Sequence, residues 1–519
     1  MSGRLWIRET TVAVRKIEEV MKKTREASVL VLIVALALGA ASCAAQGNQT
    51  PDAAASTAST ANVAAPSSVA SSAAASSSAT ADGSLPASST QPSTTAEGAT
   101  AGANAVAEPS REENDEKTQT VAAASTSGGV WPQWRGPNRD GNIVGVAAPR
   151  AWPKALKEEW KVTVGTGHAS PVVVDGKAYI FARQGEDETL LALDAATGKE
   201  LWRSSQRVAY EMNPAATGHG KGPKSTPVVS GRRVFTLGIT GILSAHDARN
   251  GRLIWRKDFS KQFPSTSPLY GTSMSPVVER NLLIAHVGGH DKGALTAFDA
   301  ETGAVKWAYD ADGPAYSSPI IATLAGERQV VTFTQKEFVG VSAATGKLLW
   351  KLAAKTGYDT NCVTAVVYQD SIIFSLESAG MMAIRPVRRA NGFAVEEVWR
   401  NGEHMLYMNS PVLQGNLLFG LSARKKGQFF CLDAATGKTL WQSGGRMGEN
   451  AAILNLSGTL LLLTNDANLI ILPANAKEYA PVAQYTVATS PTWAHPVVLA
   501  DRILVKDETT LASLSLSKQ

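Results

Sequence analysis

Five segments of the chain share one pattern of apolar and polar positions. Each has an apolar run that reaches an Asp or Ser, a polar turn that contains Gly, and a second short run that ends in Trp. Two short apolar runs joined by a turn predict a β-hairpin. The copies are LLALDAATGKELW (190–202), LSAHDARNGRLIW (243–255), LTAFDAETGAVKW (295–307), VGVSAATGKLLW (339–350) and FFCLDAATGKTLW (429–441).

The residue types of the turn explain this pattern. An Asp side chain accepts hydrogen bonds from backbone N–H groups two or three residues further on, which starts the turn. The Gly supplies the positive φ that a short hairpin loop needs. The Trp falls on the strand that leaves the turn, where a large flat side chain can fill the gap between neighbouring sheets. The residues of this structural motif are Asp194, Gly198, Trp202, Asp247, Gly251, Trp255, Asp299, Gly303, Trp307, Trp350, Asp433, Gly437 and Trp441.

Two sequence features alternate along the chain after residue 131: a Trp on each predicted outer strand, and a residue before Pro at the start of each predicted inner strand. Repeats of about 40–45 residues with four strands each are typical of β-propellers. A Pro at the first residue of a strand loses no ladder hydrogen bond, so Pro suits the start of an inner strand. The outer-strand landmarks are Trp160, Trp202, Trp255, Trp307, Trp350, Trp399 and Trp441, with Tyr485 in the equivalent place of a degenerate copy. The inner-strand landmarks are the residues before Pro at Ser170, Thr226, Ser275, Ser318, Ser410 and His495, with weaker versions at Val363 and Ile453.

These landmarks give eight inner and eight outer strands, but the first outer strand precedes any inner strand. We therefore predict an all-β fold, an eight-bladed β-propeller of four-stranded antiparallel blades whose ring is closed by the N-terminal strand around Trp160. That strand would complete the sheet that begins at Pro496, and closure would remove the free edges of an open array. A seven-bladed ring is the alternative, and it would discard the Val363 or the Ile453 unit.

The first residues have the composition of an export signal. Residues 1–43 contain the apolar stretch ASVLVLIVALALGAA after a basic segment, which is typical of a signal peptide, and Met21 is an alternative translation start. The small residues before Cys43 resemble a lipoprotein cleavage site, at which Cys43 would carry the lipid. Ordinary cleavage near Ala41 is the alternative.

A second compositional change marks the start of the propeller. Residues 44–128 are rich in Ala, Ser and Thr and have almost no large apolar side chains. Such a segment cannot bury enough surface to offset its chain entropy, so we expect a disordered linker that acts as a tether. The propeller domain is then expected over 129–519.

The AxDxxTGxxxW phrase, the SPVV strand openings and the lead-in WPQWRGPNRDG (131–141) resemble the pyrroloquinoline quinone (PQQ)-like repeat propellers. The resemblance covers nearly all of residues 131–519. It implies the fold more than the function, because one fold hosts many activities. The group includes quinoprotein dehydrogenases, which bind PQQ and calcium, and the propeller lipoprotein of the outer-membrane β-barrel assembly machine, which binds no cofactor.

The loops just before the inner strands should converge on the central axis of such a propeller. Here they carry polar and aromatic residues, which are typical of a funnel for a small ligand. The alternative is that these side chains cap strand ends and hold water. The candidate funnel residues are His168, Lys224, Tyr270, Ser273, Tyr316, Asn361, Tyr407, Asn409, Glu449, Asn450, Trp493 and His495.

Most cofactor residues of a quinoprotein dehydrogenase are missing. The resemblance implies adjacent cysteines, together with a Glu, an Asn and an Asp around calcium, but Cys362 and Cys431 lie in different repeats. Glu449 and Asn450 could act as oxygen ligands, and Asp359 stands in an equivalent loop. We therefore predict no cofactor, with PQQ and calcium as the alternative.

No other motif indicates catalysis. His286 and His290 are four residues apart, but no Glu follows the first, as a zinc protease would need, so we expect a solvent-facing turn and no metal site. No GxSxG nucleophile elbow is present, and no catalytic residue is assigned.

Charge and the N-terminal signal then favour one class of function. The formal net charge of +5 is small for 519 residues and is not clustered, so we expect no nucleic-acid partner. The leading hypothesis is an exported, non-enzymatic scaffold that is lipid-anchored to the outer membrane. Its propeller would lie in the periplasm and bind protein partners of the cell envelope, in outer-membrane protein assembly. The alternative is a PQQ-dependent or other small-molecule or sugar oxidoreductase that uses the axial funnel.

Overall fold

The computed structural model describes residues 130–517. The predicted signal peptide (1–43), the lipidation residue Cys43 and the linker (44–128) lie outside the described residues. Within the described part, no helix is both long enough and apolar enough to cross a membrane.

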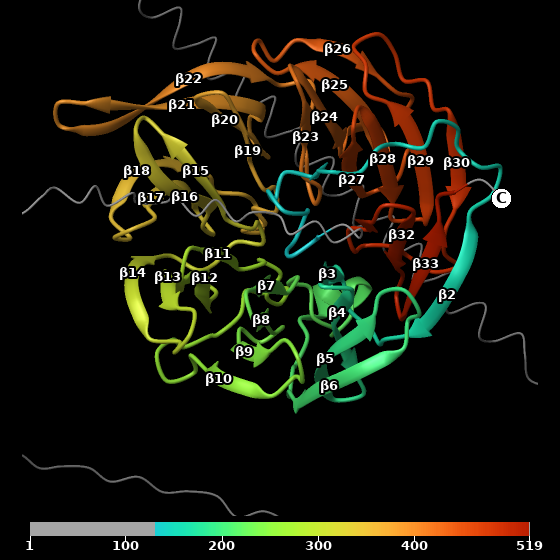
Figure 1. The fold of residues 1–519 in the computed structure, drawn as a ribbon. Coiled ribbons are helices and arrows are strands. Elements are labelled where there is room, and N and C mark those ends of the chain that lie inside the picture. Colours follow the sequence, from blue (N-terminus) through green and yellow to red (C-terminus); the bar gives the residue numbers. More distant parts are fainter. Residues whose placement is uncertain (1–129, 518–519) are drawn as a thin grey trace, which may run out of the picture. The chain divides into compact units, whose positions relative to one another are not determined.

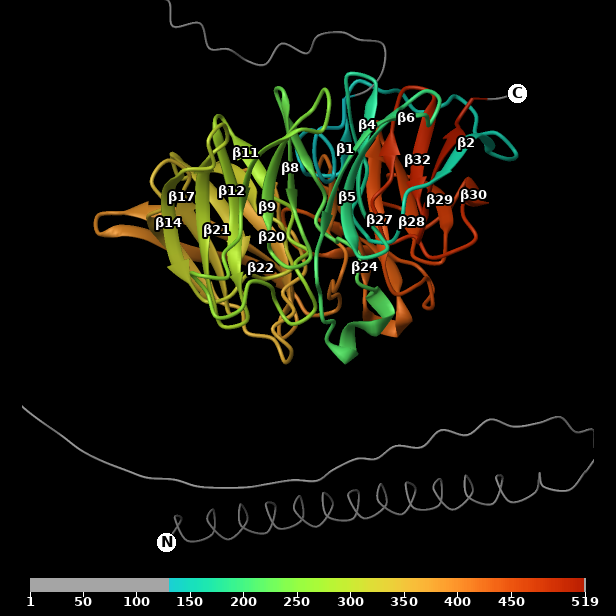
Figure 2. The same ribbon diagram turned by 90° about the horizontal axis from the view of Figure 1, so that it is seen from below.

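Eight β-sheets form a ring around a central axis (Figures 1 and 2). We number them as blades 1 to 8 in the order of their inner strands and give the inner strand first. Blade 1 has β3 (Val172–Val174), β4 (Lys177–Gln184), β5 (Asp187–Asp194) and β6 (Glu200–Arg207). Blade 2 has β7 (Val228–Ser230), β8 (Arg233–Leu237), β9 (Leu243–Asp247) and β10 (Leu253–Lys257). Blade 3 has β11 (Val277–Glu279), β12 (Leu282–Gly289), β13 (Lys292–Asp299) and β14 (Val305–Ala311). Blade 4 has β15 (Ile320–Leu324), β16 (Glu327–Phe333), β17 (Glu337–Ser342) and β18 (Leu348–Ala353).

The second half of the ring repeats this arrangement with two variations. Blade 5 has β19 (Val366–Tyr368), β20 (Ser371–Leu376), β21 (Gly380–Arg389) and β22 (Gly392–Asn401), and blade 6 has β23 (Val412–Gln414), β24 (Leu417–Ser422), β25 (Gln428–Asp433) and β26 (Thr439–Gln442). Blade 7 has β27 (Ala451–Leu456), β28 (Thr459–Thr464), β29 (Asn468–Pro473) and β30 (Ala483–Thr486), and its inner strand also pairs in parallel with β1 (Asn142–Ile143). Blade 8 has β31 (Val497–Val498), β32 (Arg502–Lys506), β33 (Thr510–Ser515) and, from the start of the domain, β2 (Lys157–Thr163). The short 3₁₀ helices η1 (Pro214–His219) and η2 (Arg424–Lys426) lie in loops.

The ring closes as the sequence predicted. Strand β2 pairs antiparallel with β33, so that Trp160 lies opposite Ser513 in the sheet that β31 begins. The units that start near Val363 and Ile453 are both complete four-stranded sheets of the ring, as blades 5 and 7. The prediction of eight blades is therefore confirmed, and the seven-bladed alternative is wrong.

The burial of the strands follows their place in the blade. The two middle strands are covered on both faces by neighbouring blades, and six central residues of β4 are buried. The outer strand β6 alternates between exposed and half-buried positions, because only one of its faces meets a neighbour. This layered packing explains why the middle strands are nearly continuous apolar runs.

The repeated Asp–Gly–Trp motif joins several blades to the next one, whereas the indole N–H of Trp350 donates to Gln329 within its own blade. Within one turn, the carboxylate of Asp194 accepts from the backbone N–H of Thr197 at 2.8 Å, and Gly198 has a φ of +72°. Between blades, the indole of Trp202 covers the turn of the following copy so closely that a Cβ on Gly251 would lie 2.4 Å from the ring. In later copies the indole N–H also reaches this turn, as Trp307 donates to the carbonyl of Ala343 at 3.1 Å. Gly is required here both for its φ and for the space it leaves to the neighbouring Trp.

This packing predicts a large stability loss for Gly251→Ala. The left-handed φ of +73° costs about 1 kcal/mol for any other residue, and the overlap with Trp202 adds about 1–3 kcal/mol. Gly231→Ala is the control, because its φ is +56° but its Cβ would meet open space, so a loss of about 1 kcal/mol is expected. Urea denaturation measures both values, and equal losses would show that the contact with Trp202 contributes nothing.

Candidate axial ligand site

A ring of side-chain hydroxyls surrounds the axis where the inner strands begin. In most blades, the inner strand is preceded by a Pro, and the residue before that Pro, or Thr364 in blade 5, donates its backbone N–H to a side-chain hydroxyl. This hydroxyl belongs to the residue at the equivalent position of the next blade. In blade 3, for example, Ser275 donates to the hydroxyl of Ser318 at 3.0 Å. Most inner strands have no strand neighbour on the axial side, so these N–H groups need side-chain partners. The complete series runs from His495 to Ser170, Thr226, Ser275, Ser318, Thr364 and Ser410, with distances of 2.8–3.0 Å.

The lead-in segment crosses the axis inside this ring. Trp131 exchanges two backbone hydrogen bonds with Val173 of β3, and β1 then pairs with β27 of blade 7, on another side of the ring. The hydroxyl series does not continue from Ser410 into blade 7, where Asn450, and no Ser or Thr, stands directly before β27. The segment from 131 to 143 therefore links the inner strands of blades 1 and 7, which are not neighbours in the ring.

Two arginines of this segment bind the inner strands through their backbone carbonyls. Arg139 donates to the carbonyls of Pro319 at 3.0 Å, Pro276 at 3.0 Å and Ser275 at 2.9 Å. Arg135 donates to the carbonyl of Pro411 at 2.5 Å. Burial lowers the pKa of Arg135 to about 10 and that of Arg139 to about 9, so both guanidinium groups stay charged at neutral pH.

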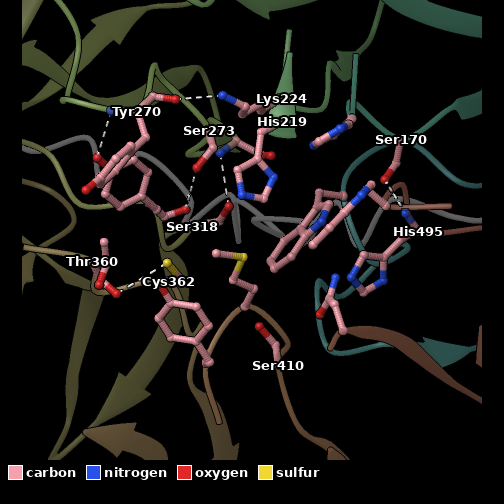
Figure 3. Close-up of a pocket in the computed structure, with 18 of the residues that line it drawn as sticks. Ser170, His219, Lys224, Tyr270, Ser273, Ser318, Thr360, Cys362, Ser410 and His495 are labelled. Carbon is pink, nitrogen blue, oxygen red and sulfur yellow. Dashed lines mark hydrogen bonds between the residues drawn. The ribbon is translucent and has the colours of Figure 1, made fainter. Parts of the chain in front are cut away.

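Above this segment lies a cavity of about 540 Å³ (Figure 3). Trp134 forms part of its floor, with the guanidinium carbons of Arg135 and Arg139 at 5.5 and 5.9 Å from the centre of its ring. The wall consists mainly of aromatic rings and hydroxyl groups. It is formed by Trp134, His168, Ser170, Ala215, His219, Lys224, Tyr270, Ser273, Ser275, Tyr316, Ser318, Tyr358, Thr360, Cys362, Tyr407, Met408, Ser410, Asn450, Trp493 and His495.

Most candidate funnel residues line this cavity, but three do not. The amide of Asn361 is buried and donates to the carbonyls of Ala354 and Gln335 at 2.7 and 3.0 Å. Asn409 is likewise buried, and its amide donates to the carbonyl of Leu421 at 2.9 Å. Glu449 is exposed and does not contribute to the cavity wall. The two asparagines brace their loops instead of facing the axis, in line with the alternative that such residues cap strand ends.

The sequence analysis missed several residues of the wall. The lead-in was identified as a motif, yet its Trp134 was not expected at the axis. His219 comes from the helix η1, which the sequence did not predict. The serines of the hydroxyl ring were predicted only as the residues that open inner strands. Their regular placement before Pro was the sequence signal that could have shown that they occupy equivalent positions around the axis. Cys362 lines the cavity with a free thiol, and burial raises its pKa to about 12.

The expectation for His286 and His290 was partly wrong. His286 lies within strand β12 and is 2% exposed, and its Nε2 is 3.1 Å from the carbonyl oxygen of Asp312. It is therefore a buried strand residue rather than part of a solvent-facing turn. Across residues 130–517, no group of three or more His, Cys, Asp or Glu side chains is arranged to hold a metal ion.

Three aromatic rings meet at one side of the cavity. His168 is stacked on Trp493 with ring centres 5.5 Å apart and an interplanar angle of 15°. His219 meets Trp493 edge to face at 5.1 Å. Burial, together with the charge of Lys224, lowers the pKa of His168 to about 3, and burial lowers that of His495 to about 3. These imidazoles are therefore neutral at neutral pH.

The wall does not provide the ligands of a PQQ–calcium site. Calcium prefers several carboxylate and carbonyl oxygens, but none of the side chains that line the described cavity is acidic. Asn450 is present, whereas Glu449 and Asp359 lie outside the wall. The free cysteines of the described chain, Cys362 before β19 and Cys431 in β25, are not adjacent in the sequence and form no disulfide over the cavity.

The chain is similar to two groups of known proteins. A family model described as outer membrane protein assembly factor BamB matches residues 151–219 and 186–443, over half of the chain. BamB from Yersinia pestis is 22% identical over 369 residues, which cover 67% of this chain and 85% of that protein. The quinohemoprotein alcohol dehydrogenase ADH IIB from Pseudomonas putida is 31% identical over 144 residues, but these cover 27% of this chain and 20% of that protein.

Solved structures of both groups have the same fold. BamB from Moraxella catarrhalis superposes with a TM-score of 0.51 at 12% identity and covers 70% of this chain and 98% of that chain. The quinohemoprotein alcohol dehydrogenase from Comamonas testosteroni superposes with a TM-score of 0.54 at 15% identity, over 75% of this chain and 81% of that chain. At such identities these likenesses show the fold and leave the function to the residues of the site.

The hydroxyl ring gives a stability prediction. Ser318→Ala removes the acceptor of the buried N–H of Ser275 and should lower the free energy of unfolding by about 1–3 kcal/mol. Ser225→Ala is the matched control, because the Ser225 hydroxyl is buried and has no hydrogen-bond partner in the described structure, so its removal should be close to neutral. Denaturant titration of both variants measures the difference, and an equally small effect at Ser318 would contradict a stabilising ring.

Proposed function

Because the chain belongs to the family of the outer membrane protein assembly factor BamB, we propose that it is a propeller scaffold for outer-membrane protein assembly. In this role it binds protein partners of the assembly machinery in the cell envelope and performs no catalysis of its own. The observation that carries the proposal is the family match, which runs over most blades of the ring. The similarity to BamB from Yersinia pestis supports it, since it covers 85% of that protein.

The composition of the cavity wall also supports a scaffold over a quinoprotein dehydrogenase. A quinone cofactor with calcium needs acidic oxygen ligands, and the side chains that line this cavity are neutral or cationic. The matched part of ADH IIB is about a fifth of that enzyme, so its activity does not carry over as a whole. An oxidoreductase is the second candidate function, and the likeness to quinohemoprotein dehydrogenases is the observation behind it.

The cellular location is part of the same proposal. The signal-like residues 1–43 export the chain, Cys43 carries the lipid that anchors it to the outer membrane, and residues 44–128 tether the propeller in the periplasm. This part is supported by sequence composition and by the BamB relationship. Stable anchoring needs more than one acyl chain, which lipoprotein modification of an N-terminal cysteine provides.

Loss of the protein should reduce the folded fraction of outer-membrane β-barrel proteins. In cells that lack the gene, gel mobility with and without heating would measure this fraction, and the full-length chain should restore it. The Cys43→Ala variant should leave the membrane fraction. Its restoration of the folded fraction of β-barrel proteins should be at least severalfold smaller than that of the wild-type chain. Ser42→Ala keeps a small residue before Cys43 and should behave like the wild type.

Two outcomes would reject the proposal. One is an unchanged folded fraction in cells without the gene. The other is reduction of a dye by the purified full-length chain when PQQ, calcium and an alcohol or sugar are added, which would favour the oxidoreductase instead.

A further inference from the structure

Lys224 is a cation at the wall of the axial cavity. Its ammonium group donates a 2.6 Å hydrogen bond to the carbonyl of Tyr270, as Figure 3 shows. No acidic side chain is among the described residues of the wall. Burial lowers the pKa of Lys224 to about 8, so it is mostly protonated at pH 7. Lys224 is half-buried, and an ammonium group that has lost part of its hydration without gaining a carboxylate partner is costly, so a bound anion would offset that cost.

Other cationic groups lie near Lys224, although Asp507 and Glu508 partly offset the charge of Lys506. Lys506 lies close behind the wall with no exposed surface, and its ammonium donates to the carbonyls of Gly167 at 2.7 Å and Asp507 at 3.0 Å. The charges of Lys224 and Lys506 both lower the pKa of His168. The guanidinium groups of Arg135 and Arg139 lie next to Trp134 at the floor. Low-dielectric walls strengthen such a field inside a concave site.

The rest of the cavity suits a flat organic molecule. The stacked pair His168 and Trp493 and the neighbouring rings of Tyr270 and Tyr316, 6.0 Å apart, offer aromatic surface. A volume of about 540 Å³ lies in the range of small-molecule sites. Two buried polar atoms of the wall, Asn450 Oδ1 and His495 Nδ1, have no hydrogen-bond partner in the described structure. A bound ligand with polar substituents would satisfy them.

We propose that the axial cavity binds a small planar organic anion, with its carboxylate at Lys224 and its ring against the aromatic wall, and that no metal ion takes part. The carboxylate forms a charge-assisted hydrogen bond with the ammonium group. Unlike a quinone–calcium site, this site needs no metal ion. The proposal does not depend on the scaffold role proposed above.

The pH dependence follows from the groups that face the ligand. Above pH 8, Lys224 loses its charge, so the affinity for a carboxylate should fall about tenfold per pH unit. Lys506 titrates in the same range, because burial lowers its pKa to about 8. The pKa values of His168 and His219 are lowered by burial and by the charge of Lys224, and Glu449 only partly opposes this at His219, so both imidazoles stay neutral there. Replacement of Lys224 separates the contribution of Lys224 to the pH dependence of the affinity from the contribution of Lys506.

Calorimetric titration of the full-length chain with 2-naphthoate tests the site. We expect binding in the presence of a calcium chelator, at least tenfold weaker binding of the uncharged 2-naphthamide, and no change when calcium is added. Lys224→Met should weaken 2-naphthoate at least tenfold and flatten the loss of affinity between pH 7 and 9. Lys221→Met is the matched control, because Lys221 is exposed in the same loop, and its affinity should equal that of the wild type.

Thermal unfolding checks that the variants are folded, and Lys224→Met should melt at or above the wild-type temperature because a buried charge is removed. No binding of 2-naphthoate, equal binding of the amide, a calcium requirement, or an unchanged affinity in folded Lys224→Met would each overturn the proposal. Outer-membrane protein folding in cells with Lys224→Met distinguishes the two proposals, since the scaffold role alone predicts a wild-type level there.

Discussion

The whole ring depends on how the axial edges of the inner strands satisfy their backbone groups. Eight short strands face the axis, and none has a strand neighbour on that side except β27, which pairs with β1. Their N–H groups are bound by hydroxyls of the next blade, and several of their carbonyls are bound by Arg135 and Arg139. Because buried backbone groups without partners are costly, these contacts fix the start of most inner strands, and β1 pairs with the inner strand of blade 7 instead. They thereby place the preceding loops around one cavity.

The two arginines make the centre of the molecule charged without any buried carboxylate at their side. Each guanidinium donates to carbonyl oxygens of inner strands instead of forming an ion pair, and burial lowers both pKa values without neutralising either group. The dipoles of the bound carbonyls are therefore the main compensation for two positive charges. This arrangement places two positive charges beside Trp134 at the cavity, while the net charge of the chain is small.

The fold could be predicted from the sequence because its signal is periodic and local. The Asp–Gly–Trp turn and the Ser–Pro step each recur at similar spacing, so the number of blades and the closing strand followed from their order. The candidate site was predicted less well, because it depends on contacts between distant residues. Arg139 binds a carbonyl 180 positions away, and no local pattern shows that. Whether a loop residue faces the axis also depends on the backbone conformation directly before the inner strand. There, Tyr407 points to the cavity, whereas Asn409 points into its own blade.

The closure of blade 8 has a consequence for the order of events during synthesis. Within the domain, β1 and β2 are made before any blade, whereas their strand partners β27 and β33 belong to the last two blades. Tyr485, for example, donates to the carbonyl of Pro153, 332 positions earlier in the chain. Contacts of such long sequence separation form slowly, because the loop entropy is lost before they are gained. Strand β2 therefore stays without its sheet partner while blades 1 to 7 assemble, although Trp131 and Arg139 can already meet blades 1, 3 and 4, and the ring closes only when the C-terminal strands are made.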